Sequence, residues 1–291
     1  MKKTVLILSC VATIFLMSCA STDEQIAFRS ETTEQAILID AGEFMIPAIL
    51  TLPKCDKPCA VVIMEHGTGS QKDEAGDGYK MLAPALAEKG IASLRFDFPG
   101  SGESKASYLL YTNEEAIRET QVVADYLANR CEIDGKRIGL LGWSQGGTDV
   151  LLAASNNDTY KSVATWAGAL VISDMATKEM RDEAMKTGQT KLEFEWREAL
   201  PLSKAWIDQA DSMDVLDYAS KINAPIGSLH GTLDSTVPFS DSEKVQAAST
   251  NAKSKLIPIE GANHTYLIFT GDLSKYNELK DKTVSWFVET L

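Results

Sequence analysis

Short apolar runs alternate with amphipathic segments of helical length along most of the chain. The run 60–64 is continuously apolar, which is typical of a strand covered on both faces. Residues 114–129 instead carry their apolar side chains at helical spacing. By these criteria we predict the following elements: strands at 46–52, 60–64, 91–96, 137–141, 163–167, 226–229 and 255–259, and helices at 79–88, 114–129, 145–154 and 275–290.

This alternation predicts an α/β fold, in which a parallel sheet has helices on both faces. The alternation stops between residues 174 and 221, where the chain is rich in charge yet keeps methionines and aromatic residues. We expect an inserted helical cap over the carboxyl ends of the strands. The alternative is a helical excursion that covers one face, with its methionine and aromatic side chains in ordinary packing.

The length of 291 residues and the apolar fraction of 44% indicate a globular protein with one large domain or two small ones. The formal charge is −13, from 41 acidic and 28 basic residues. Because phosphate binding needs clustered Lys and Arg, this charge argues against nucleic acid as a partner.

The N-terminal segment has the features of an export signal. Lys2 and Lys3 precede the apolar run 5–17, which is too short to cross a hydrocarbon core of about 30 Å. The run ends in Leu-Met-Ser-Cys, which resembles a bacterial lipobox. Cleavage after Ser18 would leave Cys19 as the lipid-modified first residue.

We therefore predict a lipoprotein signal peptide at 1–18, a tether and first-strand region at 19–42, and the main domain at 43–291. The protein would be exported to the bacterial cell envelope and held by its lipid at a membrane, facing the periplasm or in the outer membrane. The alternative is an ordinary signal peptide that is cut near Ala20.

Cys55 and Cys59 are close enough in sequence to form a disulfide in an oxidising compartment. Separate thiols are the alternative. No histidine lies near this pair in the sequence to complete a zinc site, and we predict neither a metal nor a cofactor.

The segment Gly142-Trp143-Ser144-Gln145-Gly146 matches the G-x-S-x-G turn that carries a nucleophilic serine between a strand and a helix. Such a turn strains the serine backbone and projects its hydroxyl above the sheet. The glycines are needed because the backbones pass too closely for side chains, and the helix start favours negative charge. We predict Ser144 as the nucleophile. The alternative is a glycine-rich turn without chemistry.

A serine hydroxyl needs a base to take its proton, and the chain has 3 histidines. His66 and His230 each end a predicted strand, so we expect them to bond nearby backbone. His264 lies in a loop after the last predicted strand. That is where sites with the chain order Ser, acid, His place the base.

The base needs a carboxylate that fixes its tautomer. Asp234 follows the strand at 226–229 and lies between the predicted nucleophile and base in the chain. We predict Asp234 as this acid, with Asp241 and Glu260 as alternatives.

Attack on a carbonyl creates an oxyanion, which needs preorganised N–H donors. We predict the amide of Gln145, which follows the nucleophile, and the amide of Thr68, in the loop after the strand at 60–64. Gly69 is the alternative to Thr68. We expect Asp97, in a loop after the strand at 91–96, to bond loop amides rather than to react.

Together these motifs resemble the α/β-hydrolase superfamily. The chain is most similar to the cinnamoyl- and feruloyl-esterase-like serine hydrolases and their acyl-aminopeptidase-like relatives. The resemblance rests on the segments 66–68, 97–104 and 142–147 and on Asp234 and His264. It implies a mostly parallel eight-stranded sheet with a cap that holds the acyl or aromatic part of the substrate. The candidates for an apolar pocket are Trp143, Phe194, Trp196 and Trp206, and packing in the core is the alternative for each.

The predicted activity is the hydrolysis of carboxylic esters, on hydroxycinnamoyl or other small acyl esters. A serine aminopeptidase or acyl-peptide hydrolase is the main alternative, with Glu65 or a cap carboxylate as the clamp for the substrate amine. A prolyl-oligopeptidase-type peptidase shares this domain but usually adds a large propeller, for which residues 20–42 leave no room. A thioesterase for acyl-CoA is disfavoured in an exported acidic protein, and the complete Ser, Asp and His set disfavours a silent binding module.

Overall fold

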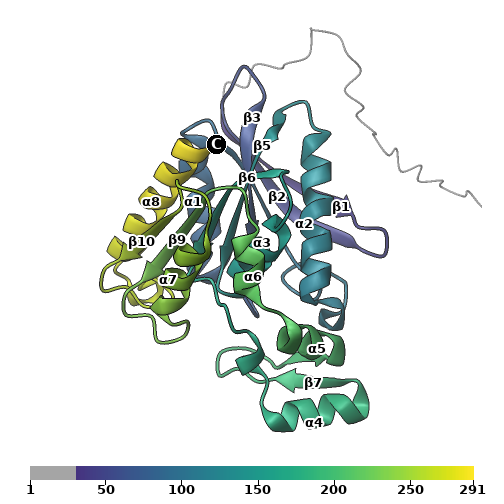
Figure 1. Cartoon of the computed structure of the whole chain (residues 1–291). Coiled ribbons are helices and arrows are strands. Elements are labelled where there is room, and N and C mark those ends of the chain that lie inside the picture. Colours follow the sequence, from purple (N-terminus) through teal and green to yellow (C-terminus); the bar gives the residue numbers. More distant parts are fainter. Residues whose placement is uncertain (1–30) are drawn as a thin grey trace, which may run out of the picture.

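The structure, a computed structural model, describes residues 31–291. Its strands are β1 (Thr33–Asp40), β2 (Met45–Leu52), β3 (Cys59–Glu65), β4 (Ala92–Phe96), β5 (Ile133–Trp143), β6 (Tyr160–Trp166), β7 (Gln189–Leu192), β8 (Leu200–Ser203), β9 (Ile226–Gly231) and β10 (Lys255–Ile259). Eight of them form one sheet in the order β1-β2-β4-β3-β5-β6-β9-β10 (Figure 1). The pairs β1–β2 and β2–β4 are antiparallel, and the other neighbours in this sheet are parallel.

The helices are α1 (Gly78–Ala87), α2 (Asn113–Ala128), α3 (Gln145–Ala154), α4 (Lys178–Thr187), α5 (Lys204–Ser212), α6 (Val215–Ser220), α7 (Phe239–Ala248) and α8 (Ser274–Thr290). Single 3₁₀ turns lie at Ala75–Asp77, Tyr108–Leu110, Ser173–Met175 and Ile268–Thr270. The predicted α/β fold with a mostly parallel sheet is confirmed.

Strand β3 shows why the run 60–64 is apolar at every position. Val61 and Ile63 pack into a core that they share with α2, α3, α6 and α7. Val62 and Met64 point to the opposite face and pack into a second core, shared with α1 and α8. Successive side chains of a strand alternate between faces, so a strand covered on both sides needs an unbroken apolar run.

Two features of the fold differ from the sequence prediction. Helix α7 was not predicted, because only Asp241, Ser242 and Val245 of its residues are buried and this set carries no apolar stripe. The segment predicted as a helical cap contains the antiparallel pair β7–β8. Each strand of this pair has four residues, which is too short for a periodicity to be recognised.

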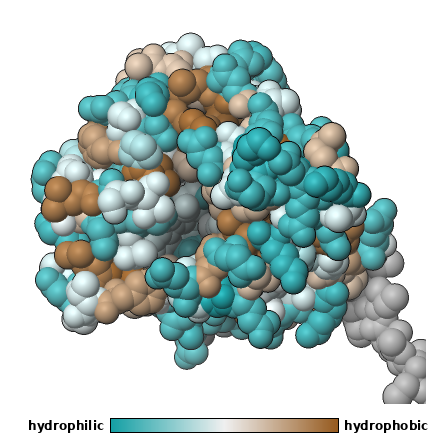
Figure 2. All heavy atoms as spheres, turned by 90° about the horizontal axis from the view of Figure 1, so that it is seen from below, coloured by the Kyte–Doolittle hydropathy of each residue, from teal (hydrophilic) through white to brown (hydrophobic). Residues whose placement is uncertain are grey.

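The inserted segment lies between β6 and β9 and contains α4, β7, β8, α5 and α6. Figure 1 shows α4, β7 and α5 at the lower end of the molecule, beyond the sheet. Figure 2 views this end directly, and a recess opens near the centre of the face. We call residues 174–221 the cap.

Residues 1–30, with the predicted signal peptide, Cys19 and part of the tether, lie outside the described residues. Among residues 31–291, no helix combines the length and the apolar composition that a membrane crossing requires. The Cys55–Cys59 disulfide stays a prediction.

Several carboxyl groups are buried beside α3. Asp149 accepts hydrogen bonds from Tyr111 Oη at 2.5 Å and from Asn113 Nδ2 at 2.9 Å. Burial raises the pKa of Asp149 to about 7, against the effect of these bonds. Burial also raises the pKa values of Glu65 and Glu119 well above their usual range. These groups hold protons in the folded protein at a pH where the unfolded chain has lost them.

Replacement of Asp149 by Asn tests this consequence. Between the ordinary pKa of 3.8 and about 7, the folded state binds more protons at this group than the unfolded state. The unfolding free energy therefore falls as the pH rises through this window, by up to about 1.4 kcal/mol per pH unit from one group. We expect Asp149→Asn to lose this part of the slope in urea unfolding between about pH 4 and about pH 7. Asp56→Asn, at an exposed carboxylate, is the control, and equal slopes in all three proteins would contradict the prediction.

Candidate active site

Ser144 lies in a turn that leaves no room for side chains next to it. The residue stands between β5 and α3 with φ 56° and ψ −119°, a strained conformation for a residue with a side chain. A Cβ on Gly142 would lie 1.9 Å from the carbonyl oxygen of Gly146, and a Cβ on Gly146 would lie 2.2 Å from that of Glu65. These clashes explain the glycine at both positions. The same close contacts seat the turn against the end of β3.

Asp234 and His264 are in direct contact. His264 Nδ1 lies 2.7 Å from Asp234 Oδ2, while Asp234 Oδ1 accepts the N–H groups of Thr236 and Val237 at 2.8 and 2.9 Å. Burial acts to raise the pKa of Asp234, but the hydrogen bonds from His230 and His264 outweigh it and hold the pKa well below its usual range. The carboxylate is ionised at neutral pH and fixes the proton of the His264 ring on Nδ1.

The loops after β9 and β10 approach each other closely enough to make this contact. Leu233 N donates to the carbonyl oxygen of Ala262 at 2.9 Å. A Cβ on Gly231 would lie 2.4 Å from the same oxygen, so only glycine permits the approach. The order of strands in the sheet thus joins two loops that are distant in sequence.

The His264 loop is attached to the Ser144 turn by a side chain. Trp143 Nε1 donates to the carbonyl oxygen of His264 at 3.2 Å. Within residues 31–291, no hydrogen bond joins the Ser144 hydroxyl to the His264 ring. The bond between a nucleophile and its base is often long before substrate binds. The structure therefore pairs His264 with Asp234. Ser144 follows Trp143, whose side chain bonds the His264 loop.

His230 also contacts Asp234, a contact that the sequence analysis missed. Its Nε2 lies 3.2 Å from Asp234 Oδ2 and 3.1 Å from the carbonyl oxygen of Val237, and its Nδ1 lies 2.7 Å from Ser242 Oγ. Both neighbours of Nε2 are acceptors, so Nε2 carries the proton and Nδ1 accepts from the Ser242 hydroxyl. The expected backbone bond is present at Val237. The short spacing between His230 and Asp234 was the signal available in the sequence.

His66 bonds only backbone, as predicted. Its Nδ1 lies 2.9 Å from the carbonyl oxygen of Gly67, and its Nε2 accepts the N–H of Phe98 at 3.2 Å. Burial lowers the pKa of His66, so the ring is neutral. Of the histidines, only His264 keeps a ring nitrogen, Nε2, that has no partner among the described residues.

The alternative acids bond elsewhere. Asp241 accepts the N–H of Leu170 at 3.3 Å and pairs with Lys244 at 3.1 Å. Glu260 accepts the hydroxyl of Thr232 at 3.3 Å. Asp234 is the acid that contacts the His264 ring in the described part of the chain.

The loop after β3, residues 66–70, meets the start of α3 at the predicted oxyanion site. Thr68 Oγ1 donates to Gln145 Oε1. The backbone N–H groups of Thr68 and Gln145 have no acceptor among residues 31–291. We call residues 66–70 the oxyanion loop. Unused N–H groups on a loop and at a helix start are the donors that an oxyanion requires.

Glu74 bonds the backbone of the oxyanion loop. No motif in the sequence indicated this role for Glu74. Its Oε2 accepts the N–H of Gly67 at 2.8 Å, and its Oε1 accepts that of Ala75 at 3.1 Å. Burial raises the pKa of Glu74 to about 7 despite these bonds.

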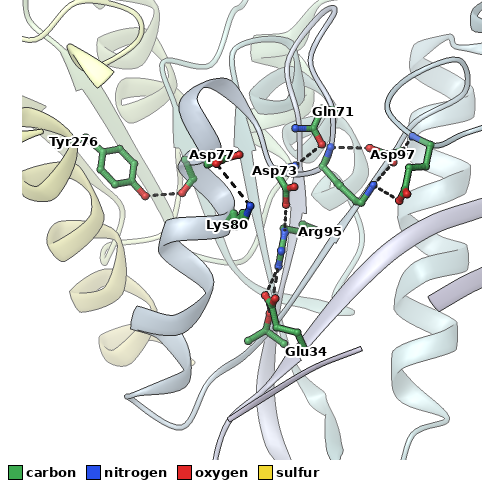
Figure 3. Close-up of polar contacts among 12 residues, drawn as sticks. Glu34, Gln71, Asp73, Asp77, Lys80, Arg95, Asp97 and Tyr276 are labelled. Carbon is green, nitrogen blue, oxygen red and sulfur yellow. Dashed lines mark hydrogen bonds and ion pairs between the residues drawn. The ribbon is translucent and has the colours of Figure 1, made fainter. Parts of the chain in front are cut away.

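Ion pairs of the buried side chains of Arg95 and Lys72 anchor the segment that follows the oxyanion loop (Figure 3). Arg95 on β4 bonds Asp73 at 2.6 Å and Glu34 at 3.0 Å. Lys72 bonds Asp97 through its Nζ at 2.7 Å and through its backbone N–H at 2.7 Å. Asp97 thus bonds a loop amide, as predicted.

The four predicted pocket aromatics divide into two pairs. Trp143 and Trp206 are 2% and 1% exposed and pack in the core, so the structure corrects the expectation that they line a pocket. A buried indole has no face left for a substrate. Phe194 and Trp196 lie on the cap, with 5.2 Å between their ring centroids. A Cβ on Gly69 of the oxyanion loop would lie 3.4 Å from Phe194 Cζ.

Comparison with protein families identifies the family of the chain. The model of the prolyl oligopeptidase family matches residues 79–291, which is more than half of the chain and includes Ser144, Asp234 and His264. The chain belongs to the prolyl oligopeptidase family. It is a hydrolase with the α/β-hydrolase fold.

Relatives of this prolyl oligopeptidase family member are distant. The Salmonella typhi protein YfhR, described as uncharacterized, is 26% identical over 223 residues, which are 75% of this chain and 68% of that protein. A putative carboxymethylenebutenolidase of Escherichia coli is 26% identical over 238 residues, which are 76% of this chain and 73% of that protein. The structure of Est1E from Butyrivibrio proteoclasticus with bound ferulic acid has a TM-score of 0.72 at 23% identity and covers 88% of this chain and 99% of that one. The last comparison shows a shared fold.

Proposed function

We propose that the protein is a serine hydrolase that cleaves carboxylic esters, with Ser144 as nucleophile, His264 as base and Asp234 as the acid that orients it. The observation that carries this proposal is the Asp234–His264 hydrogen bond of 2.7 Å, in a loop tied to the residue before Ser144. The strained backbone of Ser144 at a helix start supports the role of nucleophile.

The proposed reaction is the transfer of an acyl group to water. His264 Nε2 takes the proton of the Ser144 hydroxyl as its oxygen attacks the ester carbonyl. The amides of Thr68 and Gln145 bind the oxyanion, and His264 then returns the proton to the departing alcohol. Water, activated by the same ring, hydrolyses the acyl-enzyme and releases the acid. Asp234 stabilises the imidazolium in both steps.

The proposed substrates are hydroxycinnamoyl or other small acyl esters. The fold shared with the ferulic-acid-bound Est1E supports this class. Phe194, partly buried beside the oxyanion loop, is the aromatic side chain placed to contact an acyl group.

A serine aminopeptidase or acyl-peptide hydrolase is the second candidate, and the match to the prolyl oligopeptidase family favours it. Glu65 does not serve as its amine clamp, because the side chain is buried and bonds Thr120 at 2.8 Å. Nitrophenyl acyl esters and aminoacyl anilides, assayed in parallel, distinguish the two candidates.

We further propose that the protein is exported and anchored to a membrane by a lipid on Cys19. The basic pair Lys2 and Lys3, the apolar run 5–17 and the small Ser18 before Cys19 support this proposal.

Replacement of Ser144 by Ala removes the nucleophile. We expect a loss of about 10⁴-fold or more in kcat on nitrophenyl esters, and loss of labelling by a fluorophosphonate, with an unchanged melting curve. Ser212→Ala, at an exposed serine on the cap, is the control and keeps both activities. Ester hydrolysis at the wild-type rate by a folded Ser144→Ala variant would refute the proposed function.

Replacement of His230 tests the second hydrogen bond to Asp234. This bond draws negative charge away from the oxygen that stabilises protonated His264, so its loss stabilises the imidazolium. We expect the acid limb of the pH profile of kcat/KM to move upward by about half a unit or more in His230→Leu. His230→Gln, whose amide can donate to the same oxygen, keeps the limb near its wild-type position. The same profile in both variants would contradict this account.

Replacement of Cys19 by Ser removes the proposed lipidation site. In a bacterial host fed radiolabelled palmitate, we expect the wild-type protein to carry label and to sediment with membranes. Cys19→Ser carries no label and appears in the soluble fraction, whereas Cys131→Ser behaves as wild type. Label that persists in Cys19→Ser would show that the proposal is wrong.

A further inference from the structure

A loop of the cap contacts the oxyanion loop through an arginine. Arg197 lies between β7 and β8, and its Nη1 donates to the carbonyl oxygen of Gly69. A Cβ on Gly69 would lie 3.2 Å from Arg197 Cδ. Gly69 follows Thr68, whose amide is a proposed oxyanion donor. The guanidinium is therefore placed beside the proposed reaction centre.

Arg197 differs from the other arginines that the structure describes in having no carboxylate partner. The ion pairs within residues 31–291 include the remaining arginines, at positions 95, 118, 130, 137 and 181. The chain has 41 acidic residues and a net charge of −13, so acidic partners are plentiful. An arginine that stays unpaired in such a protein keeps its charge available for something else.

The hydrogen bonds of Arg197 leave part of its guanidinium open. Nη1 donates to Gly69 and Nε donates to the carbonyl oxygen of Glu198 at 3.2 Å. Nη2 has no acceptor among the described residues, and Nη1 has a second hydrogen. These adjacent donors form the edge that binds a planar carboxylate through two parallel hydrogen bonds.

Aromatic rings lie beside this edge. The guanidinium carbon is 5.9 Å from the ring centroid of Phe194 and 6.0 Å from that of Trp196. Trp196 is 67% exposed, an unusual exposure for an indole in a folded protein. A cation beside two aromatic rings offers an apolar surface and a positive charge to the same ligand.

We infer that Arg197 binds a carboxylate of the substrate, and that the preferred esters carry such a group a few atoms from the scissile carbonyl. This inference rests on the proposed ester hydrolysis at Ser144. The carboxylate belongs either to the acyl group, as in a half-ester of a dicarboxylic acid, or to the alcohol. The net charge of −13 repels anionic substrates on average, whereas the charge of Arg197 attracts them beside the proposed reaction centre.

The test compares ester pairs that differ in this charge. Mono(4-nitrophenyl) glutarate against 4-nitrophenyl valerate varies the acyl side, and 4-acetoxybenzoate against its methyl ester varies the alcohol side. We expect the wild-type protein to favour the anionic member of one pair, and Arg197→Gln to lower kcat/KM for that member by about 10- to 100-fold, mainly through KM. The neutral member changes by less than about 3-fold, and Arg197→Lys lies between. Arg181→Gln, at a cap arginine paired with Asp211, is the control.

Two results would overturn the inference while leaving the proposed function intact. One is Ser144-dependent hydrolysis with no preference for either anionic ester. The other is an equal loss on charged and neutral esters in Arg197→Gln, which would make Arg197 a latch between the cap and Gly69.

A binding measurement tests the carboxylate site even if the protein hydrolyses no ester and the proposed function fails. Mono(4-nitrophenyl) glutarate and 4-acetoxybenzoate are titrated calorimetrically into Ser144→Ala, with and without Arg197→Gln. Weaker binding of either anion in the double variant supports the carboxylate site independently of turnover. Equal binding in the two proteins overturns it.

Discussion

The turn at Ser144 packs its backbone against the end of β3 with no side chain between them, because Gly142 and Gly146 have none. On the other side of the contact, a Cβ on Gly67 would lie 3.2 Å from Ser144 Cβ. The serine and the oxyanion loop therefore sit at a distance that backbone sterics set, and neither can shift without the other. The Thr68–Gln145 bond joins the same two segments. Glu74 holds Gly67 in place through its bond to the Gly67 N–H.

The buried carboxyl groups near this turn differ in charge because different hydrogen-bond donors surround them. Asp149 and Glu74 accept bonds from neutral groups, and burial dominates and raises the pKa of each to about 7. Asp234 accepts bonds from two imidazoles and two backbone amides, and these outweigh burial and lower its pKa. An aspartate thus favours the protonated form at position 149 and carries a negative charge at position 234. A fixed charge at Asp234 is what an adjacent imidazole needs to act as a base.

The cap brings a different kind of charge to the same place. Arg197, which has no carboxylate partner among residues 31–291, places a cation on the oxyanion loop of an acidic protein, beside the exposed indole of Trp196. In the proposed function, the sheet supplies the groups for acyl transfer, whereas the cap supplies the groups that choose the substrate. Specificity in this architecture is therefore expected to change with the cap while the sheet stays constant.

The sequence alone determined the parts of this protein that depend on neighbouring residues. The unbroken apolar run of β3 predicts a strand covered on two faces, and Gly142, Ser144 and Gly146 predict a strained turn, because both follow from local backbone geometry and alternation. The chain order also singled out His264. Only the tertiary structure decided which groups surround these residues. His230 at Asp234, Glu74 behind Gly67 and Arg197 on Gly69 are contacts between segments that the sheet order and the cap bring together, and no local pattern encodes such distances. Trp143 and Trp206 were candidates both for the pocket and for the core, and the tertiary packing places them in the core.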